Sequence, residues 1–247
     1  MGCTDNKANP ISDSKHKYFH EMSNEEKEKI KQKIEEQDKN IEDKLKNPKE
    51  SYDNYDWDAL KKKLPVEKTK EDRKNRLKLW KKLNEYGNGY ISFKRLDVQL
   101  TNHLDLPEII RNKGPIKLAF DAACNKYERN GINKDDNLLE WMEFRIFLVY
   151  LRQYFEYFIM FQKVDSSEDL RISFDEFKKA IPLMKNWGVE IKDNEAEKEY
   201  NKIKTENEED ISFENFCNFA IQKSLDLEDD DNFDDEELKH LKGINYL

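Results

Sequence analysis

Side chains that carry oxygen alternate through a short stretch in the second half of the chain. Asp165, Ser167 and Asp169 lie two residues apart, Ser173 follows them, and Glu176 ends the series. A hard cation such as calcium binds six to eight oxygen atoms, and a loop wrapped around it turns every second residue inward. The spacing therefore predicts a calcium-binding loop of twelve residues.

The positions of this loop have different expected roles. The first, third and fifth residues would supply side-chain oxygens, and Arg171 at the seventh would supply its backbone carbonyl. Ser173 would act through a water molecule, and Glu176 would give both carboxylate oxygens. Ile172, at the eighth position, is expected to pair with a partner loop. We expect one calcium ion at this site.

Leu170 departs from the usual pattern. The sixth position of such a loop makes a sharp turn that favours glycine, and a left-handed backbone costs a residue with a Cβ about 1–2 kcal/mol. Since about 1.4 kcal/mol corresponds to a tenfold change in affinity, the substitution predicts weak calcium binding.

The residues around the loop predict two amphipathic helices. Apolar residues recur at steps of three and four on both sides of it. Before the loop they are Phe144, Phe147, Leu148, Leu151, Phe155, Phe158 and Phe161, and after it Phe177, Ala180, Ile181 and Leu183. A helix, a calcium loop and a second helix form an EF-hand.

A short motif repeats four times and indicates four such hands. Its copies are Ile91-Ser92-Phe93, Leu139-Glu140-Trp141, Ile172-Ser173-Phe174 and Ile211-Ser212-Phe213. EF-hands pair through their loops, so the repeat predicts an all-α fold of four helix-loop-helix units paired in two lobes.

The first loop has lost calcium ligands. It begins at Asn84, keeps Gly89 at the sixth position, and ends in Arg95 where a carboxylate should stand. A cation at the closing position argues against calcium binding there. We expect the hand to serve in packing.

The second and fourth loops are degenerate as well. The second, between Asp121 and Glu143, is too long for the motif because of a polar insertion. The fourth has Lys204 first and Asn215 last, which leaves only two carboxylates at ligand positions. These hands are also expected to serve mainly in packing.

Composition sets the class of protein. The chain has 247 residues, of which 36% are hydrophobic and 39% charged, with a net charge of -9. Its mean hydropathy of -1.06 indicates a strongly solvated chain. No apolar run reaches the roughly 20 residues of a membrane-spanning helix, and no signal peptide is evident, so we expect the chain to remain in the cytosolic compartment. The three cysteines are odd in number and widely spaced, which argues against a disulfide framework or a zinc site.

Neither an enzyme nor a nucleic-acid-binding protein is indicated. The sequence has no phosphate-binding glycine loop, no metalloprotease motif and no nucleophile motif. The net negative charge and the lack of a recognised motif argue against nucleic acid as a partner.

The N-terminus carries a lipidation pattern. Gly2 follows the initiator Met and Cys3 follows it, which is the arrangement for myristoylation of the glycine and palmitoylation of the cysteine. One myristoyl chain holds a protein to a membrane only marginally, whereas two acyl chains hold it stably. The usual Ser or Thr at the sixth position is here Asn6, and a chance match remains the alternative.

The pattern divides the chain into five segments. These are an acylation-type tail (1–22), a charged helical extension with a linker (23–55), an N-terminal lobe of degenerate hands (56–150), a C-terminal lobe with one calcium-type hand (151–225) and an acidic tail (226–247).

The extension is predicted to be helical. It opens with a capping box formed by Ser23 and Glu26 and carries a thin stripe of Ile30, Ile34, Ile41 and Leu45. With so little apolar surface, a solvated spacer is favoured over a partner-binding helix.

Two segments concentrate charge. Residues 60–82 hold eleven Lys and Arg against three acidic residues, and 226–237 hold nine acidic residues and no basic one. The basic segment suits anionic lipid headgroups, which contribute about 1 kcal/mol per basic residue near the surface. It equally suits the polar face of an ordinary helix. Contact between the two segments is a further hypothesis.

The chain resembles the flagellar calcium-binding proteins, or calflagins, of trypanosomes. The resemblance covers about 57–225 together with the N-terminal Met-Gly-Cys. It rests on WDALKKKLPVEKT (57–69), LEWMEFRIFLVYLRQYFEYFIMFQKVD (139–165) and FDEFKKAIPLMKNWGVEIKD (174–193). It implies a doubly acylated EF-hand protein on the inner face of the flagellar or ciliary membrane.

The resemblance also implies a ligand set. The third and fourth hands bind calcium in that family, and the third maps onto Asp165, Ser167, Asp169, Arg171, Ser173 and Glu176. A bulky residue at the sixth position is known there too. Binding by the fourth hand does not carry over, because Lys204 and Asn215 interrupt it.

Two functions follow from these observations. The favoured one is a calcium-responsive, membrane-anchored sensor or adaptor of the cilium that exposes an apolar groove to an unidentified protein partner. The alternative is a calcium-independent structural protein, packed by its degenerate hands into an axonemal or microtubule assembly.

Overall fold

The computed structural model describes residues 22–42, 59, 62–84, 87–104, 114–125, 138–205 and 207–225, with backbone alone for 37–42. Gly2, Cys3, the acidic tail and the insertion of the second loop lie outside these residues.

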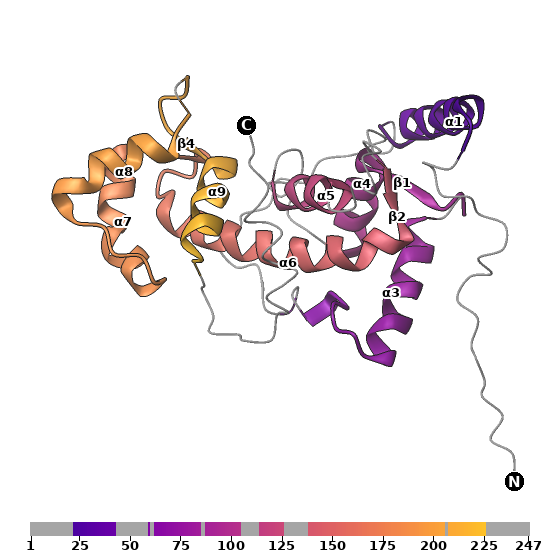
Figure 1. The fold of residues 1–247 in the computed structure, drawn as a ribbon, viewed down its shortest axis with the longest axis horizontal. Coiled ribbons are helices and arrows are strands. Elements are labelled where there is room, and N and C mark those ends of the chain that lie inside the picture. The colour runs from indigo at the N-terminus through magenta and orange to yellow at the C-terminus, as the bar shows by residue number, and fades with distance from the viewer. Residues whose placement is uncertain are drawn as a thin grey trace, which may run out of the picture.

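The described chain is mostly helical, as predicted (Figure 1). Its elements are α1 (Asn24–Glu42), α3 (Lys70–Leu83), β1 (Tyr90–Ser92), α4 (Phe93–Leu104), α5 (Pro115–Asn125), β2 (Leu138–Glu140), α6 (Trp141–Val164), β3 (Arg171–Ile172), α7 (Phe174–Asn186), a 3-10 turn (Asp193–Glu195), α8 (Ala196–Ile203), β4 (Ile211–Ser212) and α9 (Phe213–Lys223).

The four loops pair as the repeat predicts. Strand β1 pairs antiparallel with β2, and β3 pairs antiparallel with β4. The central residues of the repeat face each other, Ile91 opposite Leu139 and Ile172 opposite Ile211. All four of these side chains are fully buried. Each short strand pair therefore joins two hands by backbone hydrogen bonds and an apolar contact.

Helix α6 belongs to both pairs of hands. It follows the second loop and leads directly into the third, and Figure 1 shows it running through the middle of the molecule from β2 to the region of α9. One contiguous set of buried side chains extends along it from Leu64 to Leu225. The predicted boundary between residues 150 and 151 falls inside this helix, so the two lobes share a core.

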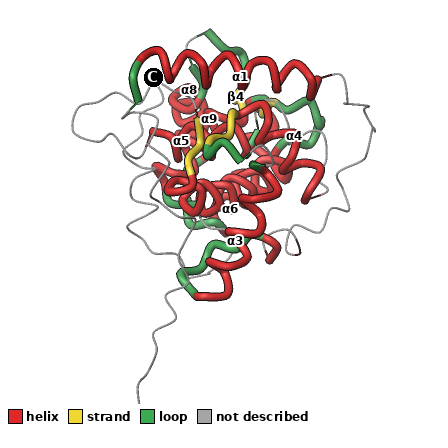
Figure 2. Tube along the Cα trace, turned by 90° about the vertical axis from the view of Figure 1, so that its right-hand side faces the viewer, coloured by secondary structure: helices red, strands yellow, loops and turns green. Residues whose placement is uncertain are grey.

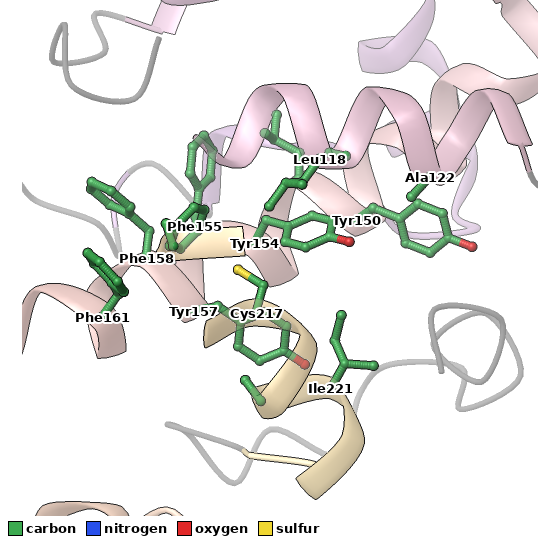
Figure 3. Packing of buried hydrophobic residues seen from close by; sticks show 14 of the residues in the cluster. Leu118, Ala122, Tyr150, Tyr154, Phe155, Tyr157, Phe158, Phe161, Cys217 and Ile221 are labelled. Atoms are coloured by element: carbon green, nitrogen blue, oxygen red, sulfur yellow. The ribbon is translucent and has the colours of Figure 1, made fainter. Parts of the chain in front are cut away.

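Helices α5 and α9 cover α6. The close-up in Figure 3 shows side chains of α5 on one side of two tyrosines and side chains of α9 on the other; the residues are Leu118 and Ala122 of α5, Tyr150 and Tyr154 of α6, and Cys217 and Ile221 of α9. Near the third loop, Phe161 makes edge-to-face contacts with Phe213 and Phe216, at ring separations of 5.5 and 5.7 Å. Such contacts add about 0.5–1.5 kcal/mol each to the burial of the rings.

Helix α1 is packed, which makes the favoured spacer interpretation wrong. Its capping box is present, with the Glu26 N–H 3.3 Å from Ser23 Oγ and the Ser23 N–H 2.8 Å from Glu26 Oε2. Ile34 is buried against Tyr90 and Leu138. Figure 2 shows α1 lying across the top of the molecule. Its stripe is short, but the β1–β2 pair supplies apolar partners far away in the sequence.

We expect Ile34→Ala to lower the free energy of unfolding by about 2 kcal/mol, because it removes a buried side chain from a small cluster. Glu35→Ala changes the exposed neighbouring residue and serves as the control. Urea unfolding of the full chain measures both. Equal effects of the two substitutions would contradict the docking of α1.

Candidate calcium site

The ends of two helices position the predicted loop. Helix α6 ends at Val164, and the Asp165 N–H donates to the carbonyl of Phe161 at 2.9 Å. Helix α7 begins at Phe174 with Ser173 as its N-cap. Asp165 and Glu176, the first and last loop residues, are 4% and 8% exposed. The helices thus bring the two most important predicted ligands to fixed places beside the core.

The Glu176 carboxylate reaches across the loop. Its Oε1 accepts hydrogen bonds from the Ser167 N–H at 2.9 Å and the Ser166 hydroxyl at 3.0 Å. Its Oε2 accepts from the N–H and the hydroxyl of Ser173, at 3.0 and 2.8 Å. Burial alone would raise the pKa of Glu176, but the bonds from Ser173, Ser167 and Ser166 outweigh it and lower the pKa to about 2.

Asp165 faces the same interior. Its Oδ2 accepts the Leu170 N–H at 2.9 Å, and its Oδ1 accepts the Ser167 hydroxyl at 3.2 Å. Burial raises the pKa of Asp165 despite these bonds, and the nearby charges of Asp169 and Glu176 raise it further. A divalent cation in the loop would offset both effects, because it favours the charged carboxylate.

The turn at the sixth position has the predicted backbone. Leu170 has a φ of 65°, in the left-handed region, and its side chain is 42% exposed. Glu168 is also left-handed, with a φ of 59°, which the sequence pattern did not indicate. The exposed Leu170 gains little packing to offset its strained backbone.

The structure brings together part of the predicted ligand set. Ser167 bridges Asp165 and Glu176, and Ser173 is bonded to Glu176, so these four lie together. Asp169 instead accepts the Arg171 N–H at 2.9 Å. Within the described ranges, no three His, Cys, Asp or Glu side chains converge as a ready metal site. The donors are all of the oxygen type that calcium prefers, and calcium binding would require Glu176 to exchange hydrogen bonds for the metal.

The fourth loop is closed by donors of the chain itself. The Lys204 ammonium lies 3.2 Å from the backbone carbonyl of Glu208, at the fifth position. The Asn215 amide, at the twelfth, donates to the Glu208 carboxylate. Lysine and asparagine thus place donors where calcium would require acceptors.

Comparison with known proteins agrees with this architecture. A family model described as the FCaBP EF-hand domain matches residues 60–151. The flagellar calcium-binding protein TB-1.7G of Trypanosoma brucei brucei is 32% identical over 192 residues, which are 73% of this chain and 78% of the relative. The chain belongs to the flagellar calcium-binding protein family.

Two further relatives extend the comparison. TB-17 of Trypanosoma brucei brucei is 31% identical over 73% of this chain and 76% of its own length. The flagellar calcium-binding protein of Trypanosoma cruzi is 30% identical over 70% of this chain and 82% of its own length. The resemblance found in the sequence is confirmed, and the family is one of EF-hand proteins rather than enzymes.

The first hand of this family member keeps its turn. Gly89 has a φ of 86°, as its sixth position requires. Arg95, at the closing position, is 2% exposed.

Sequence reasoning placed Glu143 at the end of the second loop but did not assign it the closing position. Glu143 occupies the closing position, and its Oε2 accepts the Glu140 N–H at 3.0 Å. Aligning Leu139-Glu140-Trp141 with Ile172-Ser173-Phe174 would have placed Glu143 opposite Glu176.

The low pKa of Glu176 predicts a pH-dependent contribution to stability. Its pKa is about 2 in the folded chain against an ordinary 4.5, so its contribution is complete above about pH 4.5 and disappears as the pH falls through about 2. Without calcium at pH 7, we expect Glu176→Gln to lower the free energy of unfolding by about 1–3 kcal/mol. The difference from wild type should narrow as the pH falls below about 4.5.

Urea unfolding over this pH range measures the effect, with Asp175→Asn as the matched control because Asp175 is the exposed neighbouring carboxylate. A loss of unfolding free energy in Glu176→Gln that does not change with pH would contradict the low pKa of Glu176.

Proposed function

We propose that this protein is a calcium-responsive adaptor of the flagellum, which binds one calcium ion in the third loop and is held at the membrane by acylation of Gly2 and Cys3. The observation that carries the calcium proposal is the pair of buried carboxylates, Asp165 and Glu176, that face one loop interior and share Ser167 as a bridge.

Calcium would act through the first turn of α7. Glu176 lies in that turn, and its carboxylate is bonded to both ends of the loop. Exchange of these bonds for metal ligation would redirect α7 relative to α6. Phe177 and Met184 of α7 are buried in the core, so a shift of the helix would uncover apolar surface for a protein partner.

The described structure presents little of that surface. Met142 and Leu170 are its only exposed large hydrophobic side chains. A partner that recognises an apolar groove would therefore need the helices to move first, which makes its binding dependent on calcium.

Calorimetric titration of the full chain with calcium, at physiological magnesium, tests the site. We expect one binding site in the wild type, loss of that site in Glu176→Gln, and its retention in Asp175→Asn, which removes an exposed charge from the next residue. Calcium binding that survives Glu176→Gln would overturn the proposal.

A basic surface on the first hand supports the proposed attachment of the protein to the membrane. Lys74, Lys78 and Lys81 are exposed on α3. Burial lowers the pKa of His103 on α4, and the charges of Lys82 and Lys63 lower it further. The positive charges of Lys63 and of Lys82 on α3 therefore lie close to His103, and together with the exposed lysines of α3 they could attract anionic headgroups that supplement acyl chains. None of the described helices is long and apolar enough to cross a membrane.

Flotation of the acylated chain with vesicles tests this surface. Replacing Lys74 and Lys78 by Gln should weaken binding to vesicles containing phosphatidylserine by about tenfold or more at low salt, at about 1 kcal/mol per charge. The same replacement of Lys178 and Lys179, exposed on α7, is the matched control. Similar losses in the two variants would contradict a specific basic surface.

The structural alternative has one observation in its favour. The fourth loop is closed by Lys204 and Asn215 without calcium ligands at its two ends. Detergent extraction of flagella separates the alternatives, because a lipid-held protein is released and an axonemal one stays with the microtubules.

A further inference from the structure

The third and fourth loops are joined by an ion pair in addition to their strands. The Arg171 guanidinium lies 3.0 Å from Glu208 Oε1. Arg171 is the seventh residue of the third loop, whose backbone carbonyl is an expected calcium ligand, and Glu208 is the fifth residue of the fourth loop. The pair is half exposed at Arg171 and less exposed at Glu208.

Glu208 is also the centre of the fourth loop. Its Oε2 accepts hydrogen bonds from the Asn215 amide and from the Thr205 hydroxyl, the latter at 3.0 Å. In a loaded calcium loop the metal draws the fifth and twelfth positions together. In the fourth loop a direct hydrogen bond between the Asn215 and Glu208 side chains joins these two positions.

Lys204 completes this closure at the first position. Its ammonium donates to the Glu208 carbonyl at 3.2 Å, so the first and fifth positions are joined without a metal. The loop therefore has a cationic group and an amide where a calcium loop has its first and last carboxylates.

Tyr200 of α8 forms hydrogen bonds with both of the paired loops. Its hydroxyl lies 3.1 Å from the Ile172 carbonyl of the third loop and 3.0 Å from Asp210 Oδ1 of the fourth. Its ring makes edge-to-face contacts with Phe174 and Phe177 of α7. The fourth hand is thus attached to the third loop and to its exit helix.

We propose that the fourth loop is a hand closed without metal, in which Lys204 and Asn215 replace a bound cation and Glu208 positions Arg171 in the third loop. This inference rests on the proposed calcium site only for the role of Arg171. The closure of the fourth loop stands independently of it.

The arrangement has two consequences. The pair should bind one calcium ion without cooperativity between its loops, because the fourth is already closed. The affinity of the third loop should depend on Glu208, which holds Arg171 in place and offsets its positive charge near the metal.

Hydrogen exchange of the full, calcium-free chain tests the closure. We expect the amides of 207–215 to be protected without calcium and to gain little protection when calcium chloride is added. Asn215→Ala should accelerate their exchange, whereas Asn207→Ala, at an exposed position of the same loop, should not. Fast exchange in the calcium-free wild type that slows with calcium would overturn the closed hand, whatever the third loop binds.

A double-mutant cycle read by calcium affinity tests the positioning. Glu208→Gln should weaken calcium binding by about two- to fivefold more than Glu209→Gln, which removes the exposed neighbouring charge. In an Arg171→Gln background the two substitutions should have equal effects, because the ion pair is already lost. Equal effects of Glu208→Gln and Glu209→Gln in the wild-type background would overturn the positioning of Arg171, and so would a chain that binds no calcium. In either case the hydrogen-exchange experiment would still decide whether the fourth loop is closed without metal.

Discussion

The burial of α6 is the constraint on which the rest of this structure depends. Its aromatic side chains pack against α5 on one side and α9 on the other, so hands from both halves of the chain share one core. Asp165 follows directly from the end of this helix. The first ligand of the predicted site is therefore fixed by packing along the whole helix, while the last ligand, Glu176, lies in the first turn of α7. A calcium ion between them would link the end of α6 to the start of α7.

The third and fourth loops both contain carboxylates that are at least partly buried, and they stabilise this negative charge in different ways. In the third, Asp165 and Glu176 are buried close together, and the charges of Asp169 and Glu176 contribute to the raised pKa of Asp165. In the fourth, the negative charge of Glu208 meets Arg171, and its remaining oxygen meets neutral donors. The pKa of Glu208 is lowered, since the bonds from Arg171 and Thr205 outweigh its burial. A cation would thus offset the raised pKa of Asp165 in the third loop, whereas Glu208 in the fourth loop already lies beside the cationic Arg171.

Features that depend on local sequence could be predicted, and features that depend on distant contacts could not. The sequence predicted a loop between two helices where α6 and α7 are joined, and the repeat predicted the pairing of the loops, because both follow from a fixed local geometry. The packing of Ile34 depends on Tyr90 and Leu138, which are far away in the chain. The same holds for Arg171 and Glu208, 37 residues apart. Single residues of this kind carry no signal until the fold brings their partners together.

The asymmetry of the pair affects how the protein can respond to calcium. In two calcium-binding loops joined by strands, each loop can order the other, and this coupling produces cooperative binding. A fourth loop that Lys204 and Asn215 already hold closed would not become more ordered when calcium binds to the third loop, so it would not make binding cooperative. The left-handed backbone of Leu170 is strained, and no ion bound in the fourth loop offsets the free energy of that strain. Such a pair would give a graded response to calcium, in which occupancy follows concentration through a single affinity.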